Sequence, residues 1–286
     1  MASPLIQIDL WRLLQARLGR KGKLIPHFLV RPFEKLIRQR QLNEVLRKLY
    51  PTRGEAFCQG VLRELDIRLS VDYEENMPEN PRSIFVCNHP LGGLDGMCVI
   101  SFLHRHYGMP IRVVVNDLLT AVDPLGDIFL PVNKFGSQHR ESVSALNEAL
   151  ESPYPVLFFP AGLVSRLTSD GSIRDLEWNR AFVTKAHRYH RSVVPLFFEG
   201  RNTDTFYRAG YWRRKLHIKT NVEQTLLPRE VFLGSGSRYR IVVGKPIPWE
   251  SFRAGAHAAD EAAAVCDRVY QLSELPPQNT APIVWK

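Results

Sequence analysis

Short β-branched or aromatic runs alternate with longer amphipathic stretches from residue 66 to residue 272. Each short run is bounded by proline, glycine or charged residues, which is typical of strands. The predicted strands are Asp66–Tyr73, Ser83–Cys87, Ile111–Val115, Pro155–Phe159, Ser192–Phe197 and Tyr239–Val243. The predicted helices are Leu94–His106, His139–Glu151, Glu177–His190, Thr203–Arg213 and Ala258–Leu272. This alternation predicts an α/β sandwich with a mixed, mostly parallel sheet.

The length of 286 residues is enough for a full core, and favours one α/β domain with an appendage over two equal domains. We expect a basic helical segment over 1–65, the α/β domain over 66–275 and an extended tail over 276–286. Four scattered cysteines form no pattern of disulfide or zinc-ligand spacing. This scatter predicts reduced thiols in a cytoplasmic protein. The four residues are Cys58, Cys87, Cys98 and Cys266.

The positive charge is concentrated at the N-terminus. Residues 1–50 carry +8 of the net charge of +9, and their apolar residues recur at spacings near three and four. This pattern predicts two or three amphipathic helices, interrupted at Gly22, Pro26 and Pro32. A basic amphipathic helix suits the headgroup region of an anionic bilayer, which makes a membrane surface the expected partner.

Two other interpretations of this basic segment remain open. Its apolar stripe could pack on the α/β domain with the charges merely solvated. A nucleic-acid platform is a further option, although no zinc finger, RRM or helix-turn-helix pattern accompanies the charge. No secretory signal is recognisable, and uncharged apolar stretches such as Met97–Leu103 are shorter than the roughly 20 residues of a spanning helix.

A histidine and a carboxylate follow the predicted strand at 83–87, in the stretch CNHPLGGLDG. His89 stands at the carboxyl end of a strand, where α/β folds expose reactive groups. Pro90, Gly92 and Gly93 allow a tight turn that would bring Asp95 back towards the imidazole. A carboxylate in that position would orient a histidine acting as a general base. The alternative is an Asn-His-Pro turn whose imidazole bonds only local backbone.

No protein nucleophile accompanies this base. The Gly-Ser-Gly-Ser stretch at Gly234–Ser237 lacks both the Gly-x-Ser-x-Gly spacing and the preceding strand of a nucleophile elbow. The attacking group would therefore belong to the substrate, for example a lipid hydroxyl deprotonated by His89. A second loop, FFPAGLVSR over 158–166, again leads from a hydrophobic strand into proline and glycine and ends in Ser165 and Arg166.

Four stretches in this order resemble the glycerolipid acyltransferase family, which contains lysophosphatidate acyltransferase. Asn88-His89 with Asp95 matches the first block of that family and Gly126–Leu130 matches the second. Phe159–Gly162 matches the third block, and Val194-Pro195 matches the fourth. The residues of the first and third blocks resemble those of one branch of the family. That branch contains haemolysin-like acyltransferases and enzymes that O-acylate bacterial aminolipids such as glycine or ornithine lipids.

The chain departs from the family pattern mainly where the acceptor is expected to bind. Five residues instead of four separate His89 from Asp95, and adjacent glycines could absorb the extra one. Val132 and Asn133 stand where the family has an acceptor-binding arginine, with Lys134 next, and Ala161 replaces a glutamate. The resemblance therefore implies preserved chemistry with an altered acceptor.

The resemblance implies an O-acyltransferase that moves a fatty acyl group from acyl-CoA or acyl-carrier protein to the hydroxyl of a lyso-lipid. His89 would be the base and Asp95 its orienting carboxylate, without metal or cofactor and without nucleic acid as a partner. The enzyme would work as a peripheral protein at the cytoplasmic face of the cell membrane. The expected substrate-binding residues are Asn88, Gly92, Gly93, Lys134, Phe159, Pro160, Gly162, Ser165 and Arg166.

Three of these residues carry an alternative interpretation. Arg166 and Lys134 could each bind a phosphate or could be solvated or structural, and Ser165 could merely cap a turn. At the level of the whole protein, three alternatives remain open: a 1-acylglycerol-3-phosphate acyltransferase, a thioesterase in which His89 activates water, and a noncatalytic lipid binder.

Overall fold

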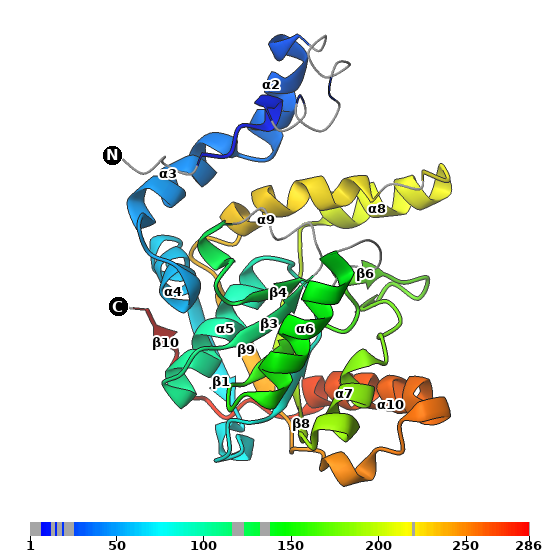
Figure 1. Ribbon diagram of the computed structural model, residues 1–286. Coiled ribbons are helices and arrows are strands. Elements are labelled where there is room, and N and C mark those ends of the chain that lie inside the picture. The colour runs from blue at the N-terminus through cyan, green and yellow to red at the C-terminus, as the bar shows by residue number, and fades with distance from the viewer. Residues whose placement is uncertain are drawn as a thin grey trace.

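An eight-stranded sheet forms the centre of the protein (Figure 1). The structure is a computed structural model, and it describes residues 7–12, 15, 19, 26–115, 123–131, 138–218 and 221–285. The sheet strands are β1 (Arg68–Asp72), β2 (Ile84–Cys87), β3 (Arg112–Val115), β4 (Phe129–Pro131), β5 (Val156–Phe158), β8 (Val193–Glu199), β9 (Arg238–Val243) and β10 (Ile283–Val284).

The strand order is β10-β1-β9-β8-β2-β5-β3-β4. Strands β8 and β9 pair antiparallel, as do β1 and β10, and the remaining neighbours in the sheet are parallel. The predicted α/β class with a mixed, mostly parallel sheet is confirmed. Because β2, β5 and β3 run parallel, the loops that follow them emerge at one edge of the sheet.

Helices cover both faces of the sheet. The α-helices that the structure describes are α2 (His27–Leu36), α3 (Gln39–Leu49), α4 (Gly54–Glu64), α5 (Leu94–Tyr107), α6 (Gln138–Glu151), α7 (Ala181–Tyr189), α8 (Asp204–Lys215), α9 (Leu227–Leu233) and α10 (Ala258–Gln271). Along β2, Phe85 and Cys87 join a core cluster with residues of α4 and α5. Ile84 and Val86 join a second cluster with residues of α6, α7 and α10. Alternate side chains of the central strand thus fill two cores on opposite faces, as expected for a sheet buried on both sides.

The six predicted strands and the five predicted helices of the α/β region are all present, but one helix begins later than expected. Helix α7 begins at Ala181 instead of Glu177 because the preceding residues make bonds that a helix would exclude. Asn179 donates its backbone N–H to the carbonyl of Pro160 (2.9 Å) and accepts the N–H of Ala181 on its side chain (2.8 Å).

Several short elements were not predicted from the sequence. They are β4, β10, the hairpin of β6 (Arg166–Leu167) and β7 (Ile173–Arg174), and α9. The hairpin strands have only two residues each, too few to show an alternating pattern. The tail is extended, and its last described residues contact the α/β domain. Ile283 pairs with Leu69 in the sheet, and Trp285 is buried.

The N-terminal 65 residues divide into a peripheral part and a core part. The break predicted at Pro32 is wrong, because α2 runs through that residue from His27 to Leu36, directly after Pro26. Gly22 lies outside the described residues. Helices α2 and α3 extend from the body (Figure 1), whereas α4 buries Phe57, Cys58 and Leu62 against the sheet. Among the described residues, no helix is long and apolar enough to cross a bilayer.

Candidate active site

His89 and Asp95 meet at the carboxyl end of β2. The Nδ1 atom of His89 lies 3.1 Å from Oδ2 of Asp95, with the imidazole 12 % exposed and the carboxylate fully buried. The ring is not aligned for a linear hydrogen bond to that oxygen. Catalytic hydrogen bonds are often misaligned in unliganded enzymes and tighten on substrate binding. The contact is that of a histidine oriented by a carboxylate, with Nε2 as the other ring nitrogen.

Asp95 organises the loop that carries the histidine. Its carboxylate accepts the backbone N–H groups of Leu91 (2.8 Å), Gly92 (3.2 Å) and Gly96 (2.8 Å). Gly92 has φ +88°, a conformation that side chains with a Cβ rarely adopt, so the turn between His89 and Asp95 requires this glycine. The five-residue spacing is therefore compatible with contact between the imidazole and the carboxylate.

Electrostatics shift both groups in the sense expected for an ion pair. Burial alone would lower the pKa of His89, but the charges of Asp95 and Asp175 outweigh it and raise that pKa above its usual value. Burial would raise the pKa of Asp95, yet His89 and the backbone N–H donors hold it below its usual value. The imidazole of His89 therefore stays protonated up to a higher pH than that of a free histidine.

Asn88 ties this loop to the neighbouring strand. Its side-chain nitrogen donates to the carbonyl of Phe198 (2.9 Å), and its oxygen accepts the N–H of Phe198 (2.6 Å). Asn202 further donates to the carbonyl of Pro90 (3.0 Å). Asn88 was expected to bind substrate. Its side-chain amide instead bonds the backbone of β8 and positions the histidine that follows it.

The third block lies against the imidazole. The ring of Phe159 is 4.3 Å from that of His89 between centroids, tilted by 34°. Pro160 and Gly162 shape the turn after β5, since the N–H of Gly162 donates to the carbonyl of Phe159 (2.9 Å). The N–H of Ser165 then donates to the carbonyl of His89 (2.8 Å), which joins the two loops through their backbones.

Asp175 is a second carboxylate beside His89, to which the sequence analysis gave no role. It accepts the backbone N–H of His89 (3.2 Å), the hydroxyl of Ser165 (2.5 Å) and the indole N–H of Trp178 (2.9 Å). Its own N–H donates to the hydroxyl of Tyr270 (2.7 Å), and burial raises the pKa of its carboxyl. Ser165 is thereby fixed by Asp175. The only sequence signal was an Asp and a Trp, three residues apart, downstream of the third block.

Arg166 is buried in what we call the arginine site, made by Arg166, Arg213 and Glu223. Oε1 of Glu223 lies 3.0 Å from Nη2 of Arg166, and Oε2 lies 3.0 Å from Nε of Arg213. Neither contact is aligned as a hydrogen bond, and Nη1 of Arg166 has no hydrogen-bond partner. Burial lowers the pKa of Arg166. Two guanidinium groups thus share one carboxylate, which leaves an excess of positive charge one residue from Ser165.

The remaining predicted site residues are placed as follows. Gly93 packs under α9, where a Cβ would lie 2.9 Å from Cγ2 of Val231. Ala161 is partly buried against the second core cluster. Lys134 lies outside the described residues, together with Val132 and Asn133.

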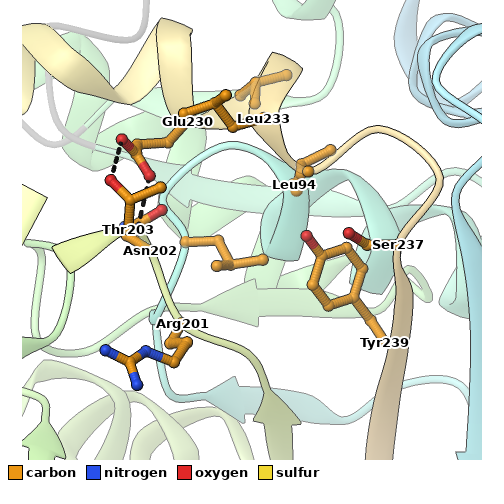
Figure 2. Close-up of a pocket in the computed structure, with 11 residues that line it drawn as sticks. Leu94, Arg201, Asn202, Thr203, Glu230, Leu233, Ser237 and Tyr239 are labelled. Atoms are coloured by element: carbon orange, nitrogen blue, oxygen red, sulfur yellow. Dashed lines mark hydrogen bonds between the residues drawn. The ribbon is translucent and has the colours of Figure 1, made fainter. Parts of the chain in front are cut away.

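A small cavity of about 100 Å³ lies beside the loop that carries His89 (Figure 2). Leu91 and Leu94 of the loop form part of its lining, and His89 does not line it. On the far wall, Glu230 accepts the N–H (2.7 Å) and the hydroxyl (2.8 Å) of Thr203. Within the described part of the chain, no group of three or more histidine, cysteine, aspartate or glutamate side chains is arranged to hold a metal.

Comparison with known proteins identifies the family of the chain. A family model described as Acyltransferase matches residues 12–275. The chain belongs to this acyltransferase family. Two curated relatives are both named Lyso-glycine lipid O-acyltransferase. The protein from Phocaeicola vulgatus is 38 % identical over 93 % of this chain and 95 % of its own length. The protein from Bacteroides thetaiotaomicron is 35 % identical over 94 % of this chain and 98 % of its own length.

Among solved structures, the acyltransferase is similar to the 1-acyl-sn-glycerophosphate acyltransferase of Thermotoga maritima. That match has a TM-score of 0.46 and 15 % identity, and covers 88 % of this chain and 95 % of the other. The family assignment, which rests on the sequence matches, confirms the predicted acyltransferase identity. It also makes the chain an enzyme of the transferase class.

Proposed function

We propose that this acyltransferase moves a fatty acyl group from an acyl thioester to the hydroxyl of a lyso-lipid, with a lyso-glycine lipid as the acceptor. The names of both curated relatives support the acceptor class. The observation that carries the chemistry is the 3.1 Å contact between His89 and Asp95 at the end of β2. A histidine held by one nitrogen presents the other to substrate.

The proposed reaction uses His89 as a general base. Nε2 takes the proton from the lyso-lipid hydroxyl, and the hydroxyl oxygen attacks the carbonyl carbon of the thioester. The carbon–sulfur bond breaks, the imidazolium returns the proton to the departing thiolate, and a free thiol and an ester are released. Asp95 stabilises the imidazolium that forms in between. The thioester is that of acyl-CoA or acyl-carrier protein.

The arginine site is proposed to hold the acidic headgroup of the acceptor. A glycine headgroup offers one carboxylate, and guanidinium groups bind carboxylates through charge-assisted hydrogen bonds. Glu223 offsets one of the two positive charges of Arg166 and Arg213, so the site matches a single negative charge better than a phosphate dianion. Reaction at the cytoplasmic face of the membrane, with the protein peripheral, is part of the proposal because the acceptor stays in the bilayer.

Thiol release from palmitoyl-CoA and palmitoyl-carrier protein tests this function. The purified chain is assayed with lyso-glycine lipid, lyso-ornithine lipid, lysophosphatidate or no acceptor. We expect release that requires lyso-glycine lipid, with ester formation detected by mass spectrometry. His89→Ala should abolish it, whereas His187→Ala, an exposed histidine on α7, should not.

Each other outcome would indicate a different function for this protein. Release with lysophosphatidate alone would indicate a 1-acylglycerol-3-phosphate acyltransferase. Release without acceptor would indicate a thioesterase. No release with any donor, together with vesicle binding that His89→Ala leaves unchanged, would indicate a noncatalytic lipid binder.

A further inference from the structure

Helix α8 and the turn after it carry large apolar side chains on their outer surface. Trp212 is 50 % exposed and Leu216 is 64 % exposed, with Tyr211, Ile218 and Val222 also exposed. The inner surface of the same helix buries Phe206 and Tyr207 against the protein, so the helix already has a packed apolar side. A second apolar side on the outside of a helix is unusual for a solvated surface and marks an interaction site.

Basic residues surround these apolar side chains. Residues 208–218 contain four arginine or lysine residues and no aspartate or glutamate. Arg208, Arg214 and Lys215 are exposed, and the ammonium group of Lys215 lies 5.0 Å from the ring centroid of Trp212. Aromatic rings flanked by cations are typical of a helix that lies in the interface of an anionic bilayer.

This surface lies on the same side of the protein as α2. In Figure 1, α8 and α9 run along one edge of the body, and α2 rises beyond them. Leu36 at the end of α2 packs against the apolar cluster that contains Phe206 and Tyr207 of α8, which joins the two regions. Helix α2 itself exposes Phe28, Leu29 and Phe33. Two helices with exposed apolar side chains therefore lie in the same part of the molecule.

The same surface is close to the candidate active site. Arg213, next to Trp212 in the chain, contacts Glu223, which contacts Arg166 in the arginine site. Arg214 donates to the carbonyl of Leu167 (3.1 Å). One layer of side chains thus separates the outer surface of α8 from residues proposed to hold the acceptor headgroup.

We propose that this outer surface of α8 and the following turn, formed by Tyr211, Trp212, Leu216, Ile218 and Val222, docks on an anionic lipid bilayer. It is a second membrane contact, separate from the basic N-terminal segment. Docking here brings the arginine site to the headgroup layer, so that an acceptor needs to rise only partly from the membrane. The proposal rests on the proposed function only in taking the acceptor to be a membrane lipid.

Vesicle partitioning of the full chain tests this docking. Flotation is measured with vesicles of phosphatidylglycerol and phosphatidylcholine, and with phosphatidylcholine alone. We expect Trp212→Ser/Leu216→Ser to lower partitioning onto the anionic vesicles roughly tenfold or more. Arg208→Gln/Lys215→Gln should weaken it at low salt and have less effect at high salt. Residual binding through α2 is expected in both.

The matched control changes exposed residues of the same kinds elsewhere. Val284→Ser/Arg105→Gln removes an apolar side chain that is 62 % exposed on edge strand β10 and a cation at the end of α5. Partitioning of this variant should equal that of the wild type. A Trp212→Ser/Leu216→Ser protein that still partitions like the wild type would overturn the proposal.

Two further measurements separate docking from other causes. With acceptor in neutral detergent micelles, thiol release by Trp212→Ser/Leu216→Ser should match the wild type, because only the approach to a bilayer has changed. If the wild type releases no thiol with any acceptor, the proposed function fails while the vesicle result still stands by itself. Sedimentation that shows a wild-type dimer and a monomeric variant would assign the surface to a second copy of the chain, and would overturn bilayer docking.

Discussion

The His89–Asp95 pair and the arginine site are both buried ionic groups, but they are satisfied to different degrees. Asp95 accepts three backbone N–H groups in addition to facing His89, and leaves no charge uncompensated. The arginine site has two guanidinium groups for one carboxylate, and Nη1 of Arg166 is without a hydrogen-bond partner. A pair of one imidazole and one carboxylate suits proton transfer, whereas a site with two guanidinium groups for one carboxylate suits the binding of an anion. The predictions below test this division of roles.

The largest effect is expected from Asp95→Asn. The amide keeps the size of the side chain but cannot stabilise an imidazolium, so kcat should fall by roughly 10² to 10⁴ with little change in KM. Steady-state thiol release measures it, with Asp66→Asn, at an exposed carboxylate, as the control. A fall of less than tenfold would show that Asp95 only shapes the loop.

Glu223→Gln should have the next largest effect, and it should be on stability. Removing the only negative charge leaves Arg166 and Arg213 buried together, and breaking a buried ion pair costs about 3 kcal/mol or more. Urea unfolding measures this loss. Glu199→Gln changes a carboxylate that is 60 % exposed beside Arg240 and should cost well under about 1 kcal/mol. Equal costs would mean that the buried site holds no excess charge.

Arg166→Gln should act mainly on KM for the acceptor. Loss of one charge-assisted contact to a headgroup predicts a KM about 10- to 100-fold higher, with kcat less affected. Arg253→Gln, at an exposed arginine near Glu261, is the control. A fall in kcat at unchanged KM would place Arg166 with the chemistry and remove the contrast between the two sites.

Asp175→Asn should have a smaller effect on turnover. Asp175 bonds the backbone of His89 and the hydroxyl of Ser165, so its loss loosens the position of the imidazole without removing its partner. We expect kcat to fall about fivefold and Ser165→Ala to reproduce part of that fall. A fall as large as that of Asp95→Asn would mean that both carboxylates take part in proton transfer.

The pH dependence of kcat/KM should show how strongly each of the two carboxylates raises the pKa of His89. His89 must be neutral to accept a proton, so kcat/KM should rise with pH to a plateau above the raised pKa of His89. Asp95→Asn removes the largest charge that raises this pKa, and the acidic limb should move to lower pH. Asp175→Asn should move it in the same direction by less. An acidic limb that both variants leave in place would belong to another group.

The strands and the His89–Asp95 contact could be predicted because their signals are local. Hydrophobic runs ending in proline and glycine mark strand ends, and a stretch of seven residues, 89–95, holds both the imidazole and the carboxylate. Arg213 and Glu223 could not be predicted. They lie 47 and 57 residues from Arg166 in the chain, and Arg213 belongs to a run of basic residues typical of a solvated surface. The packing of α8 against β6 and against the short helix Val222–Leu226 brings the three residues together.

The N-terminal expectation illustrates the same limit. Charge and periodicity predicted amphipathic helices over 1–65, and α2 and α3 are such helices. The sequence could not show that α4, with the same spacing of apolar residues, inserts Phe57 and Leu62 into the core. Periodicity identifies an apolar side but not the surface that covers it. The membrane role of the segment stays a prediction.

The paired bonds of Asn88 to Phe198 predict that the loop carrying His89 and the sheet open together in hydrogen exchange. The amide of Phe198 is closed by a side chain of the loop, so it can exchange with solvent only when loop and strand separate. We therefore expect His89, the residue after Asn88, to keep its position until the loop and the strand separate. Heat inactivation of the enzyme should accordingly coincide with melting of the sheet, and no folded but inactive state should accumulate before it.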